Sequence, residues 1–208
     1  YKKIPFSGIQ SLTKEDIFFT NKLGYKIKLL GFCFNKKQDL KLVVAPFLVS
    51  KKKELSSVNK NLNAVIFETV SGNKNILVGE GAGGESTAIS VVSDLMSMQD
   101  NKKNYVFGIP HTKLNEMKIS NVENTKNLYY IRALVFDRPG AIASITSILS
   151  DYKISIKSLF QESVNHKFFN VVLLTHKTNH SFISKASKKL NKSNFLKENT
   201  KIMQVLHI

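Results

Sequence analysis

Between Ile76 and Met96 the chain reads ILVGEGAGGESTAISVVSDLM, and this stretch predicts a strand, a glycine-rich turn and a helix. The short apolar run at 76–78 is followed by glycines, which let the chain turn sharply or approach another surface closely because they lack a Cβ. Ser86 or Thr87 is expected to cap a helix from Thr87 to Gln99. Its apolar residues recur at helical spacing and predict one apolar face: Ala88, Val91, Val92, Leu95 and Met96.

The turn contains the pattern G-x-G-x-x-G at Gly79, Gly81 and Gly84. A dinucleotide site of the Rossmann type also needs a second strand that carries an acidic residue about 20 positions further on. The residues beyond the helix, from Asp100 to Asn104, are typical of a loop instead. We therefore interpret the turn as a tight strand-to-helix corner near a ligand rather than as the first turn of a Rossmann fold.

Composition limits the class of protein. The 208 residues are 42% hydrophobic, which favours a packed core in one or two domains. The single cysteine, Cys33, excludes an internal disulfide and suits a reducing cytoplasm. No apolar run reaches the roughly 18 residues of a membrane helix, and no signal peptide opens the chain. We expect a cytoplasmic protein with no membrane partner.

The net charge of +16 raises the question of nucleic-acid binding. The lysines are spread along the chain, and arginine, the usual reader of phosphates and bases, occurs only at Arg132 and Arg138. We expect no nucleic-acid partner. A basic nucleic-acid binder stays open as a third possibility, and it predicts steeply salt-dependent binding to any duplex.

The first half predicts a largely antiparallel sheet with helices on one face. A capping box at Thr13 and Asp16 begins a helix that should bury Ile17, Phe18 and Leu23 and stop at Gly24. Four strands follow at 25–34, 41–49, 63–70 and 75–78, with a turn at 71–73. Pro46 places the second strand at an edge or a bulge.

Several blocks of this half resemble homoserine dehydrogenases in their order. They are FSGIQSLTKEDI at 6–17, LGYKIKLLG at 23–31, PFLV at 46–49, NAV at 63–65, GEGAGGESTA at 79–88 and VVSDL at 91–95. The resemblance covers nearly all of residues 4–98 and corresponds to the later part of that family's catalytic region. Glu-Ser-Thr-Ala stands at 85–88 where many members of the family have Pro-Thr-Ala.

Residues 100–127 are rich in Asn and Lys and are expected to form a linker that includes a turn at 107–110. Beyond it, residues 128–208 predict the order βαββαβ, a ferredoxin-like arrangement. The strands are expected at 128–136, 154–160, 168–175 and 202–207, and the helices at 141–152 and 181–190. We predict an α+β protein: 1–99 from a catalytic domain, 100–127 a linker and 128–208 a regulatory domain.

The strand that ends in Asp137-Arg-Pro-Gly140, with the helix after it, resembles an ACT domain, a small-molecule sensor that often binds amino acids and usually pairs. The resemblance implies an effector loop formed by Asp137, Arg138, Pro139, Gly140 and Ala141, where N–H groups at a helix start attract a carboxylate. Asp137 should cap the helix, with Pro139 in its first turn. The alternative is that these residues only start a helix. L-Threonine is the expected effector, and a homodimer the expected assembly.

No catalytic or metal-binding constellation emerges from the residues themselves. His176 and His180 are four positions apart but lie off any predicted helix, so we expect no metal. Cys33 is expected to be a small core residue, and Lys28 to lie on a solvated face. The family resemblance implies that the catalytic lysine and the substrate carboxylates lie upstream of Tyr1, and that Gly81, Ala82, Gly83 and Gly84 contact an NADP or NAD cofactor.

The resemblance therefore implies a homoserine dehydrogenase, which interconverts L-aspartate 4-semialdehyde and L-homoserine with NAD(P)H in threonine, methionine and isoleucine biosynthesis. The 208 residues alone are expected to be a fragment and inactive. The alternative is a free-standing regulatory module that binds an amino acid through its ACT half and acts on a partner enzyme. The two hypotheses differ in what the reading frame encodes upstream of Tyr1.

Overall fold

A computed structural model describes residues 4–36, 39–99, 105, 108–115, 117, 119–120 and 125–206. The chain divides into two compact units: Tyr1–Lys51 together with Met117–Ile208, and Lys52–Glu116. The first unit therefore joins the start of the chain to its end. The predicted final-strand residue His207, the predicted turn residue Phe107 and part of the predicted linker lie outside the described residues.

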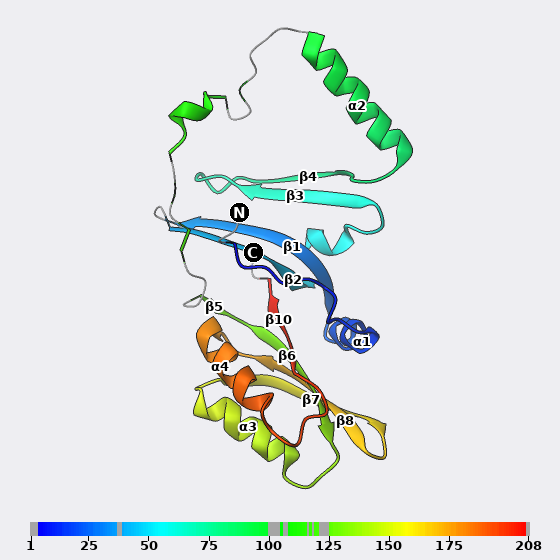
Figure 1. Ribbon diagram of the computed structural model, residues 1–208, viewed down its shortest axis with the longest axis vertical. Helices are drawn as coiled ribbons and strands as arrows, with labels where there is room; N and C mark the ends of the chain where they lie inside the picture. The colour runs from blue at the N-terminus through cyan, green and yellow to red at the C-terminus, as the bar shows by residue number, and fades with distance from the viewer. Residues whose placement is uncertain are drawn as a thin grey trace. The chain divides into compact units, whose positions relative to one another are not determined.

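A six-stranded sheet forms the centre of the first unit (Figure 1). Its order is β1-β2-β10-β6-β8-β7, so strands from both ends of the chain share one sheet. The strands are β1 (Tyr25–Lys36), β2 (Asp39–Ser50), β6 (Tyr129–Phe136), β7 (Ile156–Asn165), β8 (Phe168–Thr175) and β10 (Lys201–Val205).

The predicted βαββαβ order is confirmed in the second half of the chain. It runs β6, α3 (Ala141–Asp151), β7, β8, α4 (His180–Leu190) and β10. The four strands lie in the order β10-β6-β8-β7, which is that of the ferredoxin-like fold. Both helices cover one face of the sheet, with Ile145 and Ile183 buried against alternate residues of β6. A short ladder of β5 (Lys126–Asn127) and β9 (Thr178–Asn179) accompanies them.

The other face of this sheet is covered by α1 (Lys14–Lys22). Phe19 of α1 joins a buried cluster with Leu48 of β2 and with residues of β6, β8 and β10, among them Tyr130, Val172 and Met203. The capping box at Thr13 is confirmed, as is the stop at Gly24, which adopts φ +83°.

The expected buried side of α1 was wrong in part. Ile17 and Phe18 are 57% and 52% exposed, whereas Asp16, Phe19 and Thr20 are buried. The reason is that the sheet presents the charged Arg132 to this helix, so the helix turns its acidic face inward. Leu23, also expected inside, does pack against the buried cluster.

Strand β2, which contains Pro46, has a neighbouring strand on each side, so the expected edge position was wrong. β2 pairs along its length with β1, and at Phe47 and Leu48 with β10 in parallel. On the same side, Val44 exchanges hydrogen bonds with Pro5 and Ser7. Pro46 lies between Val44 and Leu48, where the chain changes from one partner to the other and a missing N–H is tolerated.

The second unit contains η1 (Glu54–Ser57), β3 (Leu62–Glu68), β4 (Lys74–Glu80), α2 (Gly84–Gln99) and η2 (His111–Lys113). β3 and β4 form a separate antiparallel hairpin whose turn uses Gly72 at φ +82°. The expectation that all four early strands share one sheet was therefore wrong, because β2 takes β10 as its second neighbour. Apolar residues are exposed on both strands and on α2: Val65, Phe67, Leu77, Val78, Val92 and Leu95.

Two single residues also differ from expectation. Cys33, expected in the core, is an exposed free thiol on β1. Lys28, expected on a solvated face, is partly buried, and this desolvation lowers its pKa. Within the described ranges, no helix has the length and apolar character that crossing a membrane requires.

Candidate functional sites

The glycine turn joins the end of β4 to the start of α2 and is solvent-exposed throughout. The backbone N–H of Gly81 donates to the Asn61 carbonyl at 2.8 Å, and the Asn61 side chain reaches the Ala82 carbonyl at 3.4 Å. These bonds fix the turn to the residues just before β3. The turn is therefore a defined corner that presents backbone, rather than side chains, to its surroundings.

Two of the four glycines are constrained by the geometry of the turn, each in a different way. A Cβ on Gly81 would lie 1.3 Å from Nδ2 of Asn63, so the backbone passes too close for a side chain unless Asn63 moves. Gly83 adopts φ +130°, which L-residues rarely reach. Gly84 has neither constraint, since an added Cβ meets nothing within 4 Å. The close contact at Gly81 is thus made within the chain, by the Asn63 side chain.

Helix α2 begins at Gly84, three residues before the predicted start. Ser86 and Thr87 were expected to cap it, but both hydroxyls donate back to the Gly83 carbonyl, at 3.1 and 2.7 Å. The capping prediction was therefore wrong, because these side chains lie inside the first turn. Helix geometry supplies no acceptor for the N–H groups of Gly84, Glu85 and Ser86, whereas the Thr87 N–H donates to the Gly83 carbonyl at 3.1 Å.

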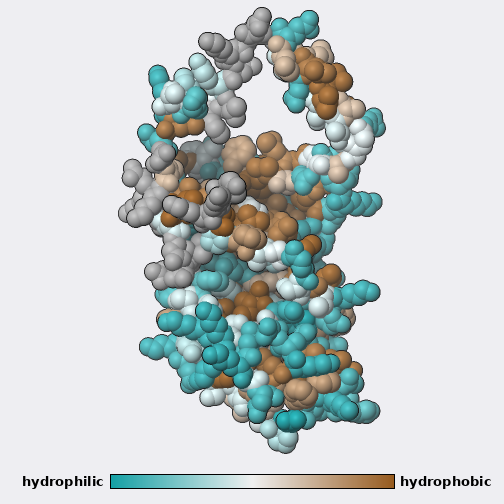
Figure 2. Space-filling view, viewed as in Figure 1, coloured by the Kyte–Doolittle hydropathy of each residue, from teal (hydrophilic) through white to brown (hydrophobic). Residues whose placement is uncertain are grey.

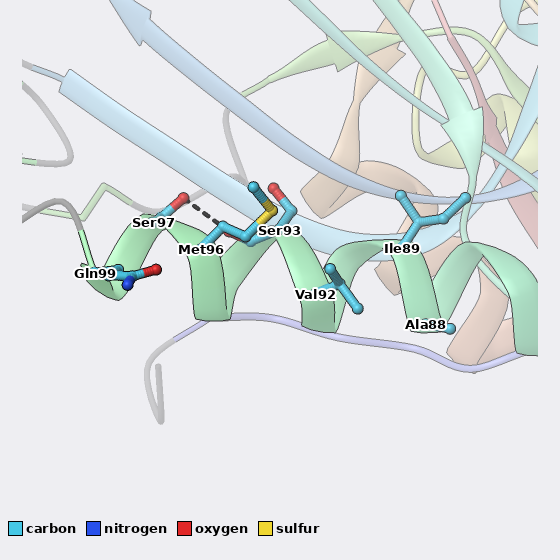
Figure 3. A pocket seen from close by; sticks show the side chains of 7 residues that line it. All are labelled: Ala88, Ile89, Val92, Ser93, Met96, Ser97 and Gln99. Atoms are coloured by element: carbon cyan, nitrogen blue, oxygen red, sulfur yellow. Dashed lines mark hydrogen bonds between the residues drawn. The ribbon is translucent and has the colours of Figure 1, made fainter.

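One side of α2 lines an open groove of about 740 Å³ (Figure 3). Its lining is mostly apolar: Ala88, Ile89, Val92, Ser93, Met96, Ser97 and Gln99. Figure 2 shows apolar residues gathered along this helix. None of the residues of α2 (Gly84–Gln99) is buried, so the amphipathic face predicted from the sequence has no cover in the described part of the chain.

The loop from Asp137 to Ala141 connects β6 to α3 in the first unit. Gly140 is the N-cap of α3 at φ +84°, and this cap receives no side-chain hydrogen bond. Asp137, expected to be the cap, lies three residues earlier and uses its N–H to bond the Lys167 carbonyl at 2.9 Å. The capping prediction was therefore wrong, and Pro139 precedes the first turn that it was expected to occupy.

The start of α3 leaves polar backbone groups at an exposed position. Ala141 donates its N–H to the Arg138 carbonyl at 3.3 Å, and Ser144 donates both N–H and Oγ to the Gly140 carbonyl. The N–H groups of Ile142 and Ala143 lie in the first turn, where helix geometry supplies no acceptor. Such a helix start favours an anionic group such as a carboxylate.

Two cations, one of them Arg138 of the loop itself, stack on two aromatic rings. The Arg138 guanidinium lies 5.1 Å from the centre of the Phe136 ring, and Lys197 Nζ lies 4.2 Å from that of Phe168. The two rings pack on each other at 5.0 Å. The stacking fixes the Arg138 guanidinium over the Phe136 ring and gives the loop a positive charge.

A buried polar network that the sequence did not reveal lies between α1 and β6. Arg132 Nε donates to Asp16 Oδ1 at 2.6 Å and Nη2 to Oδ2 at 3.2 Å, while Nη1 reaches Asn170 Oδ1 at 3.1 Å. Tyr130 Oη donates to Asp16 Oδ1 at 3.3 Å. Burial alone would lower the pKa of Arg132, but the hydrogen bond and charge of Asp16 outweigh it and raise that pKa.

In the described ranges, no group of three or more His, Cys, Asp or Glu side chains could hold a metal ion. The two histidines singled out by spacing have other surroundings. The backbone N–H of His176 bonds the Ser155 carbonyl, and His180 Nδ1 lies 3.3 Å from Tyr129 Oη. Exposed helix starts, which favour anions, occur at α2 and at α3.

This geometry defines the class of the protein. It is an α+β protein with a glycine-rich strand-to-helix corner and a ferredoxin-like module. Residues 1–96 match the family model of homoserine dehydrogenase, and residues 129–194 match that of the ACT domain. The chain is thus a relative of homoserine dehydrogenases that carries an ACT domain, and both resemblances predicted from the sequence are confirmed.

Individual relatives agree with this assignment. The homoserine dehydrogenase of Helicobacter pylori is 31% identical over 193 residues, which are 91% of this chain and 45% of that protein. That of Bacillus subtilis is 29% identical, over 90% of this chain and 44% of its own length. A crystal structure of a homoserine dehydrogenase from Thiobacillus denitrificans gives a TM-score of 0.77 at 30% identity, covering 96% of this chain and 47% of that one.

The chain spans about half the length of the relatives that it matches. The likeness extends across the glycine corner and the ACT domain in one collinear order. The activity, substrates and partners of the whole relatives therefore come to this chain only as a proposal.

Proposed function

We propose that the chain works as part of an NAD(P)-dependent homoserine dehydrogenase, which interconverts L-homoserine and L-aspartate 4-semialdehyde. The observation that carries the proposal is the collinear match of 91% of the chain to one kind of enzyme at 31% identity. By this proposal the protein serves threonine, methionine and isoleucine biosynthesis in the cytoplasm and acts as a homodimer. The hydride chemistry belongs to the nicotinamide when it is bound.

The glycine turn is the part of this chain that we assign to the cofactor. Gly81, Ala82, Gly83 and Gly84 present backbone without bulky side chains, and the α2 start adds N–H groups that attract a phosphate. The turn is held by Asn61 and so needs little reorganisation on binding. These features fit a contact to one part of NADP or NAD, with the rest held elsewhere in the enzyme.

The exposed apolar groove of α2 supports a contact between this chain and another domain of such an enzyme. We assign 1–99 to the catalytic domain, 100–127 to a linker and 128–208 to the regulatory domain. Apolar patches of this kind on a folded protein mark an interaction site. In our proposal the groove side of α2, with Val92 and Met96, packs on the domain that holds the cofactor.

The activity assay uses homoserine-dependent reduction of NADP⁺. The purified 208-residue chain is expected to be inactive, and the product of the reading frame extended upstream of Tyr1 is expected to be active. Activity of the 208 residues alone would contradict the assignment of the chemistry to upstream groups. Inactivity of an extended, folded product would favour the free-standing regulatory module instead.

The effector assignment rests on the loop of Asp137, Arg138, Pro139, Gly140 and Ala141. Its helix start, with Arg138 fixed by Phe136, fits the carboxylate of an amino acid, and L-threonine is our candidate. A thermal-shift titration with L-threonine beside other amino acids tests this. A rise in melting temperature specific to threonine, lost in Arg138→Met, is expected. A flat response to threonine would reject this effector for the 208-residue chain.

A further inference from the structure

The ion pair between Asp16 and Arg132 joins two segments that are far apart in sequence. Asp16 belongs to the part matched by the homoserine dehydrogenase model, and Arg132 to the ACT domain. Both side chains are buried, at 0% and 3% exposure, and they meet through two hydrogen bonds. A bidentate guanidinium–carboxylate contact of this kind fixes geometry as well as charge.

The surroundings of the pair complete its hydrogen bonds from both sides. Asn170 of β8 and Tyr130 of β6 complete the hydrogen bonds on the sheet side. On the helix side, Asp16 also accepts the backbone N–H of Thr13 at 3.0 Å, which is the capping bond of α1. The carboxylate therefore starts the helix and docks it at the same time. Loss of Arg132 leaves the Asp16 carboxylate buried without its ion-pair partner, whereas loss of Asp16 leaves Arg132 with Glu198, whose Oε1 lies 3.6 Å from Nη1.

Other contacts also join residues 4–51 to the ACT domain. Phe19 packs with Tyr130 and Met203, and the Leu206 N–H donates to the Leu48 carbonyl at 2.8 Å. β2 thereby extends the ACT sheet beyond β10. The outer face and the β10 edge of the ACT domain are both occupied by residues 4–51 of the same chain.

We propose that the Asp16–Arg132 pair is a clasp that makes residues 4–51 and the ACT domain one cooperative unit. A change in the ACT sheet then passes directly to α1 and the β1–β2 hairpin, without crossing the linker. The clasp residues are positioning residues, since they act by holding α1 on β6. This inference does not depend on the identity of the effector or on the enzyme activity.

Native-state hydrogen exchange of the 208-residue chain tests the clasp. In the parent chain, the slow amides of α1 and those of β6 are expected to share one opening reaction. Ile145→Val removes a buried methylene on the far side of the sheet and should speed exchange in both places by the same factor, about three- to tenfold. If Ile145→Val leaves the exchange rates of the α1 amides unchanged, α1 opens on its own and the proposal is overturned.

Arg132→Met then separates the two parts. Exchange in α1 should become about a hundredfold faster and stop responding to Ile145→Val, while β6 still responds. Lys189→Met, in the exposed ion pair with Asp151, is the matched control and should leave α1 nearly unchanged. If Arg132→Met does not fold, Asp16→Asn replaces it, with Asp151→Asn as its exposed counterpart. Equal effects of a clasp variant and its control would also overturn the proposal.

Discussion

Arg132 Nε lies 2.6 Å from Asp16 Oδ1, and the two residues are 116 positions apart. Truncating one member of such a buried pair strands the other charge, so Arg132→Met alone should cost about 3–5 kcal/mol of unfolding free energy. The double variant Asp16→Leu/Arg132→Met removes both charges and should recover most of this loss. It still lacks the bond to Thr13, which leaves about 1 kcal/mol unrecovered.

Urea unfolding of the two single variants and the double variant measures the coupling between them. If the losses of the single variants simply add in the double variant, the pair contributes no specific interaction. Asp151 and Lys189 form an exposed ion pair at 2.7 Å and provide the comparison. Removing that pair should change stability little, because solvent screens exposed charges.

Much of the fold was predictable because its signals are local. The Thr13–Asp16 capping box, the stop at Gly24 and the βαββαβ order all follow from spacing and turn chemistry within a few residues. The inward face of α1 was not predictable in this way. Asp16 reads as a capping residue, and its burial depends on Arg132, which no local pattern connects to it.

The candidate sites were predictable in position and less so in detail. The glycine corner and the loop before α3 lie where the sequence placed them, at exposed helix starts. Their caps were misassigned because Ser86, Thr87 and Asp137 are all good capping residues by type. Which one caps depends on where the backbone turns, and Gly83 at φ +130° and Gly140 at φ +84° set that point.

Replacing Gly81 tests the close approach at the corner. The new Cβ of Gly81→Ala would meet the Asn63 amide, which must leave its present rotamer at a cost of about 0.5–1.5 kcal/mol. Asn63→Ala removes that obstacle, so Gly81→Ala should cost much less in its presence. Exchange rates of β3 and β4 amides report the effect, with Gly84→Ala as a nearly neutral control. Equal costs with and without Asn63 would contradict the contact.

Replacing Gly140 tests backbone strain at a position where an added side chain would not be crowded. In the described part of the chain, no atom lies within 4 Å of a Cβ built here, yet φ is +84°. Gly140→Ala should therefore cost about 1–2 kcal/mol from the left-handed conformation alone. Gly140→Asn should cost less, since asparagine tolerates this region better. Thermal unfolding distinguishes the two, and equal losses would mean that crowding rather than φ decides.

From the raised pKa of Tyr129 we predict how stability changes at alkaline pH. Burial raises its pKa from 10.0 to about 12 because the phenolate would lose its hydration. A raised folded-state pKa favours the protonated form, so its contribution to stability is complete below about pH 10 and is lost as pH rises toward about 12. Tyr129→Phe should flatten this part of the stability profile. An unchanged alkaline profile in Tyr129→Phe would show that other groups cause the loss.

From the exposed apolar residues on the groove side of α2 we predict that the 208-residue chain associates in solution. Val92 and Met96 are 54% and 69% exposed along one helix, and a continuous apolar stripe in water favours association. Light scattering should therefore show association of the parent chain that increases with concentration, and Val92→Lys should reduce it. Ser90→Lys adds the same charge to α2 at a position that does not line the groove, so it should have little effect. Equal reductions by both variants would assign the change to net charge and not to the groove.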